Sequence, residues 1–120
     1  MVISSKGYPN RVALFLFIRS VSRQGDMNNP KKSCRITVRG VVQGVGFRYH
    51  TRRIAHSLGI SGWVKNMDDG SVLIADEGAP YAMERFINWL YEGPPRARVS
   101  QVEVKEAPKL ENFEGFETRF

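Results

Sequence analysis

Residues 34–59 read CRITVRGVVQGVGFRYHTRRIAHSLG, and the spacing of their apolar side chains changes halfway along. Apolar and polar residues alternate over residues 34–38, which is the pattern of a half-buried strand. From Phe47 onward the apolar residues recur at helical spacing, and Gly59 stands where a helix commonly ends. Three glycines fall in the segment 40–46 between these patterns. This part of the chain therefore predicts a strand, a glycine-rich loop and a helix in direct succession.

The rest of the chain predicts three strands, a helix and a last short strand. Residues 62–67 and 71–76 are strand-like and are joined by Asp68-Asp69-Gly70, a tight-turn signal. Pro80 suits the first position of a helix that Gly93-Pro94-Pro95 ends. The helical stripe comprises Met83, Phe86, Ile87 and Leu90, and further strands are expected over residues 101–105 and 115–120. The order predicts an α+β, ferredoxin-like split βαβ fold (βαββαβ), an antiparallel sheet with two helices on one face.

The basic charge of the chain is concentrated before the first predicted strand. The whole chain of 120 residues has a net charge of +6, but residues 1–32 contribute +5 and residues 33–120 only +1. We therefore divide the chain into a leader, 1–32, and a single domain, 33–120. Cys34 is the only cysteine, which excludes an intrachain disulfide and a cysteine-based zinc site. Its place in an apolar strand predicts inert packing.

The leader has three interpretations that the sequence leaves open. Its apolar run, residues 12–18, is far shorter than the roughly 20 residues that cross a bilayer as a helix. As a secretory signal the run is at the lower size limit and is interrupted by Arg19, whereas a transit peptide fits the basic, serine-containing composition. Translation from Met27 is the third interpretation. In each case we expect residues 1–32 to be disordered or to lie outside the mature fold.

The glycine-rich loop predicts a site for an oxyanion. The first amides of a helix have no partner within the helix and point outward, and the helix dipole adds partial positive charge. Arg48, in the first helical turn, can add a forked cationic donor. The loop has neither the Gly-Lys-Ser/Thr ending of a Walker A motif nor the third glycine of a dinucleotide fingerprint. Taken alone, the same spacing also fits a structural turn followed by a surface arginine.

Two longer segments resemble the signatures of the acylphosphatase family. VRGVVQGVGFR, residues 38–48, resembles the first signature, and GWVKNMDDGSV, residues 62–72, with Gly78, is similar to the second. GPPRARV, residues 93–99, resembles a third common segment. The resemblance spans residues 33–120 in the family's order of elements, and the leader has no counterpart.

The resemblance implies a metal-independent hydrolase of acyl phosphates, which are carboxyl-phosphate anhydrides, giving a carboxylate and inorganic phosphate. It implies that Arg48 binds the phosphate and Asn66 orients the attacking water. The backbone amides of the loop would bind phosphate together with Arg48; these residues are Gln43, Gly44, Val45, Gly46 and Phe47. No metal or cofactor is expected, and no nucleic acid or membrane partner. The expected protein is a free-standing cytoplasmic monomer acting on a small acyl phosphate, whose acyl group the sequence does not identify.

Two other functions are carried as alternatives. RNA-recognition domains share the split βαβ topology, but an aromatic RNP1-like strand is missing and residues 33–120 are nearly neutral. An acyl-phosphate-binding accessory unit, of the kind found in larger carbamoyl-transfer maturation proteins, is the second alternative. Because the chain stops at Phe120, we expect the free-standing enzyme. Other side chains that could take part in catalysis or binding are assigned structural roles. We expect His50 and His56 to lie on the surface, Asp68 and Asp69 to form a turn, and Trp63 to pack against its neighbours.

Overall fold

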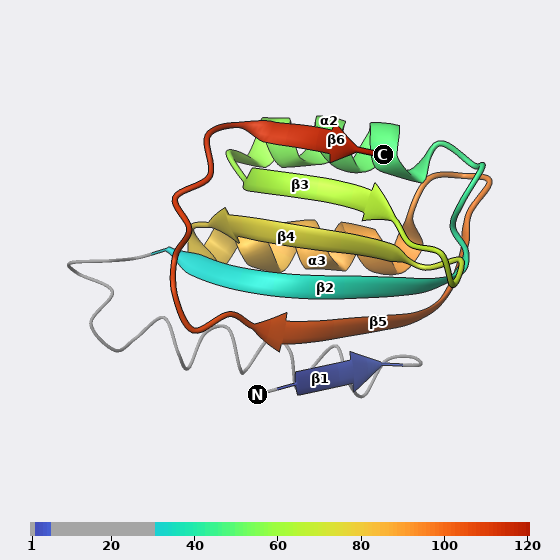
Figure 1. The fold of residues 1–120 in the computed structure, drawn as a ribbon, viewed down its shortest axis with the longest axis horizontal. Helices are drawn as coiled ribbons and strands as arrows, with labels where there is room; N and C mark the ends of the chain where they lie inside the picture. The colour runs from blue at the N-terminus through green and yellow to red at the C-terminus, as the bar shows by residue number, and fades with distance from the viewer. Residues whose placement is uncertain (1, 6–30) are drawn as a thin grey trace.

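One mixed sheet with two helices on one of its faces makes up the described part of the chain (Figure 1). The computed structural model describes residues 2–5 and 31–120. In chain order the elements are β1 (Val2–Ser5), β2 (Lys32–Val41), α2 (Phe47–Leu58), β3 (Ser61–Asn66), β4 (Val72–Gly78), α3 (Pro80–Glu92), β5 (Arg98–Glu106) and β6 (Phe116–Arg119). The strand order across the sheet is β1-β5-β2-β4-β3-β6.

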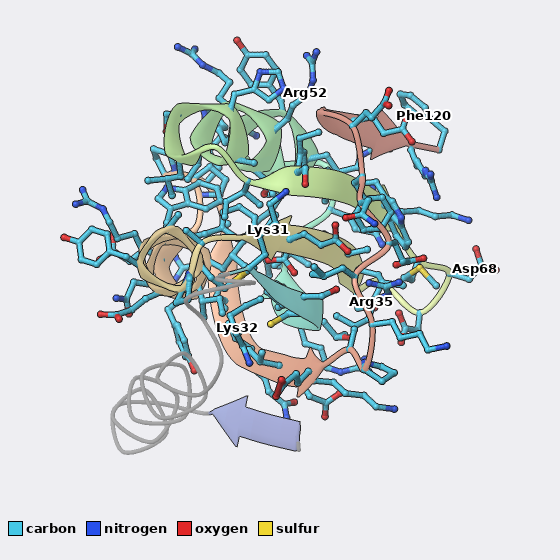
Figure 2. The ribbon with its side chains drawn as sticks, turned by 90° about the vertical axis from the view of Figure 1, so that its left-hand side faces the viewer. Lys31, Lys32, Arg35, Arg52, Asp68 and Phe120 are labelled. Carbon is cyan, nitrogen blue, oxygen red and sulfur yellow. The ribbon has the colours of Figure 1, made fainter. Side chains whose placement is uncertain are left out.

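The topology confirms the predicted ferredoxin-like fold. Strand β2 pairs antiparallel with both β4 and β5, and β4 pairs antiparallel with β3. The units β2-α2-β3 and β4-α3-β5 therefore interleave, each connecting two parallel strands across a third. Figure 2 shows the sheet end on, with both helices on one side and Arg35 on the other. The expectation of an antiparallel sheet needs one change, because β6 pairs parallel with β3.

Strand β1, at one edge of the sheet, was not predicted from the sequence. Strand β1 pairs antiparallel with β5, with Val2 opposite Lys105 and Ser5 opposite Val102. Strand β2 begins at Lys32, one residue before the predicted start of the domain. The other residues of the predicted leader, 1 and 6–30, lie outside the described residues. The proposed dispensability of the leader stays a prediction.

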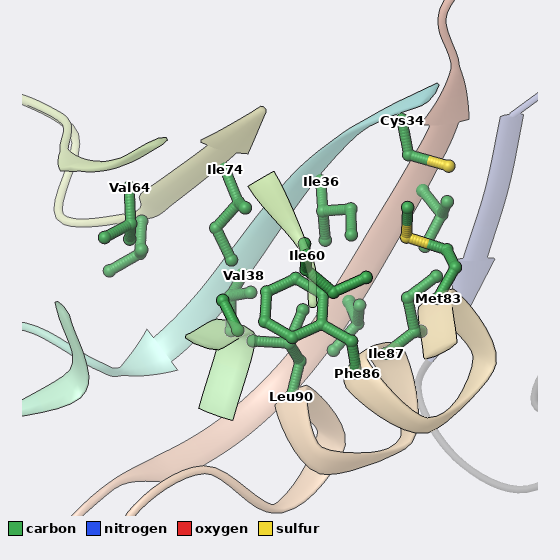
Figure 3. Close-up of a cluster of buried hydrophobic side chains, with 14 of the residues drawn as sticks. Cys34, Ile36, Val38, Ile60, Val64, Ile74, Met83, Phe86, Ile87 and Leu90 are labelled. Atoms are coloured by element: carbon green, nitrogen blue, oxygen red, sulfur yellow. The ribbon is translucent and has the colours of Figure 1, made fainter. Parts of the chain in front are cut away.

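The core between the sheet and the helices follows the predicted apolar stripes (Figure 3). The stripe of α3 is completely buried, as are Cys34, Ile36 and Val38 on the facing side of β2. Phe47 and Ala55 of α2 are buried on the same side of the sheet, whereas Ile54 and Leu58 are partly buried against the core. Cys34 is confirmed as a packed thiol, and its burial raises its pKa well above the ordinary value.

Asp76 is an acidic residue inside this core. It lies on β4 opposite Cys34, is completely buried, and neither carboxyl oxygen has a hydrogen-bond partner among the described residues. Burial raises the pKa of Asp76 well above the ordinary value, and the nearby positive charge of Arg35 opposes that rise only in part. Because the native carboxyl holds its proton more tightly than the unfolded chain does, the contribution of Asp76 to stability falls as pH rises above about 4, the unfolded value.

We expect Asp76→Asn to remove this loss of stability. Asparagine keeps the shape but has no charge to desolvate, so the free energy of unfolding should rise by about 1–3 kcal/mol near pH 8 and much less near pH 5. Urea unfolding at both pH values measures the difference. Asp68→Asn, in the exposed turn, is the matched control and should change neither value by more than about 0.5 kcal/mol. A wild-type stability that does not fall between these pH values would contradict the expectation.

Candidate active site

The loop between β2 and α2 has the shape that its glycines allow. Gly44 and Gly46 have φ angles of 74° and 79°, in the left-handed region that other residues rarely adopt. Gly46 is also the N-cap of α2, and because it has no side chain, the helix begins without a side-chain cap. Among the described residues, the backbone amides of residues 43–47 have no hydrogen-bond partner. These amides and the helix dipole make a favourable place for an oxyanion.

A pocket of about 350 Å³ opens at this point. One side is formed by the loop and the first turn of α2, through Val42, Gly44, Gly46, Phe47, Arg48 and Tyr49. The remaining wall comes from three different elements, through Arg52 of α2, Asn66 of β3, Thr118 of β6, and Phe120. The predicted phosphate loop, the predicted arginine and the predicted asparagine therefore meet in one cavity.

The guanidinium of Arg48 is held in place by the carboxyl-terminal segment. Its Nη1 donates a hydrogen bond to the Arg119 carbonyl oxygen at 3.0 Å, and its Cζ lies 4.7 Å from the centre of the Phe120 ring. Among the described residues, no carboxylate forms an ion pair with Arg48. The charge of Arg48 is therefore oriented without being neutralised, as a binding group for an anion requires.

Asn66 is the last residue of β3 and lines the same pocket. Its Oδ1 is buried and has no hydrogen-bond partner among the described residues. A buried amide oxygen without a partner is costly, so its presence in a pocket indicates that a ligand or water binds it.

Gln43 ties the loop to the neighbouring hairpin, because its Nε2 donates to the carbonyl oxygens of Met67 at 2.7 Å and Ser71 at 2.9 Å. The glycine-rich loop is therefore fixed to the hairpin whose first strand, β3, ends at Asn66.

Five of the predicted site residues line the pocket and two do not. Gly44, Gly46, Phe47, Arg48 and Asn66 line it. The side chain of Gln43 turns to the hairpin, and Val45 packs against the core. Four other residues that line the pocket were not predicted from the sequence: Tyr49, Arg52, Thr118 and Phe120. Helical spacing from Arg48 could have found Arg52, but no local signal places Thr118 or Phe120.

The side chains given structural roles lie outside the pocket. His56 is exposed and His50 partly buried, and neither lines the cavity. Asp69 serves the hairpin turn: hydrogen bonds from Ser71, and then Arg39, lower its pKa to about 2. Trp63 is partly buried, with the Arg119 guanidinium 4.8 Å from its ring centre. Among the described residues, no group of three or more His, Cys, Asp or Glu side chains is placed to hold a metal ion.

Fold and pocket together define a ferredoxin-like α+β protein with a pocket at a strand-to-helix loop that suits an oxyanion. Residues 34–118 match the family model Acylphosphatase, and the chain belongs to the acylphosphatase family. Hydrolysis of acyl phosphates is the function of this family. An acylphosphatase of Thermotoga maritima is 52% identical over 89 residues, which are 74% of this chain and 98% of that relative.

Two kinds of solved structure resemble the fold. The acylphosphatase from Bacillus subtilis has a TM-score of 0.72 at 40% identity, covering 73% of this chain and 98% of that one. HypF from T. kodakarensis has a TM-score of 0.66 at 40% identity, but the match covers 74% of this chain and only 12% of HypF. Within the described residues, no helix has the length and apolar character needed to span a membrane.

Proposed function

We propose that this chain hydrolyses acyl phosphates with Arg48 and the loop amides as the phosphate site and Asn66 as the water-holding residue. The observation that carries the proposal is the pocket itself. It is lined by an uncapped helix N-terminus, by an arginine without a carboxylate partner among the described residues, and by Asn66, whose buried amide oxygen has no partner among them either. The two groups at the helix would bind the phosphoryl oxygens. The amide oxygen would accept a hydrogen bond from water.

To catalyse this reaction the protein needs to do little more than position the water and the phosphoryl group and stabilise the negative charge of the transition state. Water attacks phosphorus, the bond between phosphorus and the bridging oxygen breaks, and its electron pair leaves with the carboxylate. The proton of the attacking water goes to a phosphoryl oxygen, so the products are a carboxylate and dihydrogen phosphate. Because a carboxylate is a good leaving group, no strong general acid is needed. Arg48 and the amides of residues 43–47 stabilise the charge on the equatorial oxygens in the transition state.

Turnover of benzoyl phosphate in the presence of a metal chelator tests the proposal. Loss of benzoyl phosphate well above the uncatalysed rate, with equal amounts of benzoate and phosphate released, is the expected result. The likeness to one segment of HypF favours a second candidate, an accessory unit that binds an acyl phosphate without hydrolysing it. Phosphate binding without turnover would support that candidate and contradict the hydrolase.

We propose that the enzyme acts as a monomer in the cytoplasm on a small molecule, without a nucleic-acid partner. A pocket of about 350 Å³ suits a small molecule, and the near neutrality of residues 33–120 does not favour nucleic acid. A mass close to 13.6 kDa by light scattering is the expected result. A stable dimer would contradict this part of the proposal.

Removal of residues 1–26 is expected to leave catalysis intact. Strand β1 pairs with β5 at one end of the sheet order, whereas β3 and β6, which carry pocket residues, lie at the other end. A chain that begins at Met27 should therefore keep kcat/KM within about twofold, since sites without shared contacts act nearly independently. Parallel assays of the full and shortened chains on benzoyl phosphate measure this. A tenfold loss in the shortened chain, with folding intact, would show that the leader takes part in the site.

A further inference from the structure

A second arginine lies in the pocket beyond the proposed phosphate site. Arg52 is four residues after Arg48 on α2, and side chains at this spacing are neighbours on one helix face, about 5–6 Å apart at Cβ. Figure 2 shows Arg52 above α2, with Phe120 on the same upper side of the molecule. Nε of Arg52 donates a hydrogen bond to the Phe116 carbonyl oxygen at 3.3 Å. That bond orients the guanidinium and leaves Nη1 and Nη2 as further donors.

The charges of the side chains that line the pocket indicate what Arg52 could bind. Among the residues that the structure describes, two arginines and no aspartate or glutamate line the pocket. Other arginines of the chain, Arg35 and Arg39, form ion pairs with carboxylates, whereas Arg52 forms none among the described residues. Under the proposed function, the phosphoryl charge is met by Arg48 and the loop amides. An acyl phosphate with an uncharged acyl group therefore leaves Arg52 without a counter-charge.

We propose that Arg52 selects acyl phosphates whose acyl group carries a second anionic group, such as a carboxylate. The inference rests on the proposed function, because it needs the phosphoryl group to lie against Arg48. A guanidinium held through Nε can offer its two remaining nitrogens to a carboxylate as a bidentate pair. Arg52 is thus a specificity-determining residue, and it takes no part in the bond that breaks.

The competing role for Arg52 is structural, since its bond to Phe116 links α2 to β6. That role would affect every substrate alike, so a ratio between two substrates separates the two roles. The probes are 3-carboxybenzoyl phosphate and 3-carbamoylbenzoyl phosphate, which have nearly the same shape and differ by one negative charge. The meta position prevents the carboxylate from attacking the anhydride within the molecule. Uncatalysed hydrolysis of each probe is measured and subtracted.

In the wild type, kcat/KM for the carboxylated probe should exceed that for the amide probe by about tenfold at low ionic strength. Added salt should reduce the preference, because exposed charges are screened. Arg52→Gln should bring the ratio close to one while changing the amide probe by less than about threefold. Arg53→Gln is the matched control: Arg53 is the next residue of the same helix, is exposed and does not line the pocket, so the preference should persist.

Equal loss on both probes in Arg52→Gln, or a wild type that hydrolyses the amide probe but shows no preference for the carboxylate, would overturn this inference alone. A wild type that hydrolyses neither probe would overturn the proposed function together with the inference.

Discussion

Arg48→Ala is expected to lower kcat/KM for benzoyl phosphate by about a thousandfold or more. An arginine that stabilises the charge of a transferring phosphoryl group is worth about 10³ to 10⁵ in rate. Arg48 lines the pocket beside the uncapped start of α2 and is already oriented by Arg119 and Phe120. Removing the Arg48 side chain eliminates both the positive charge and the oriented hydrogen-bond donors of its guanidinium. Initial rates of benzoate release, followed by absorbance, measure the effect.

Arg48→Lys separates charge from geometry. Lysine keeps one positive charge but has no planar fork, so kcat/KM should recover only in part. Because Arg48 bonds to the backbone of β6, urea unfolding should accompany the assay to show that both variants are folded. Activity within about tenfold of wild type in a folded Arg48→Ala variant would contradict its role, because a single oxyanion donor is already worth about 10²–10³.

Asn66→Ala is expected to lower kcat by about 10² to 10³ with little change in KM. The proposed role of Asn66 is to hold the attacking water, which matters in the transition state and hardly at all for binding the phosphoryl group. Steady-state kinetics on benzoyl phosphate, with inorganic phosphate as a competitive inhibitor, separate the two effects. The inhibition constant for phosphate should stay within about threefold of the wild type.

The opposite kinetic pattern would assign Asn66 another role. A large rise in KM and in the phosphate inhibition constant, with kcat unchanged, would make it a phosphate-binding group. Asn66→Asp is a useful second variant, since it preserves the shape but brings a negative charge toward the phosphoryl oxygens. It should therefore weaken phosphate binding as well as turnover, in contrast to Asn66→Ala.

Local pattern was enough to predict most of the fold. The stripe of α3 is set by helical spacing, and Pro80 and Gly93 mark its ends, so sequence and structure agree there. The hairpin between β3 and β4 follows from its turn residues in the same way. The parallel pairing of β6 with β3 was not predicted, because pairing between distant segments depends on packing that no local period records.

The candidate site was likewise predicted in part: the residues with a local sequence signal were found, and those placed by distant packing were not. Glycines and an arginine at a strand-to-helix junction predicted an oxyanion site from local chemistry, and the resemblance of two signatures added Asn66. The wall formed by Thr118 and Phe120 depends on where β6 lies, so it was missed. Buried Asp76 was also missed: alternation along β4 places it on the core face, yet a carboxyl is not a residue expected there.

Hydrolysis of benzoyl phosphate in oxygen-18-labelled water tests the central claim most directly. If the loop, Arg48 and Asn66 direct water to phosphorus, the label must appear in the inorganic phosphate, and benzoate must carry none. Mass spectrometry of both products, with a chelator present and the uncatalysed reaction subtracted, gives the answer. Label in the benzoate would place the attack at the acyl carbon and contradict the account, as would a failure to release phosphate faster than in the absence of protein.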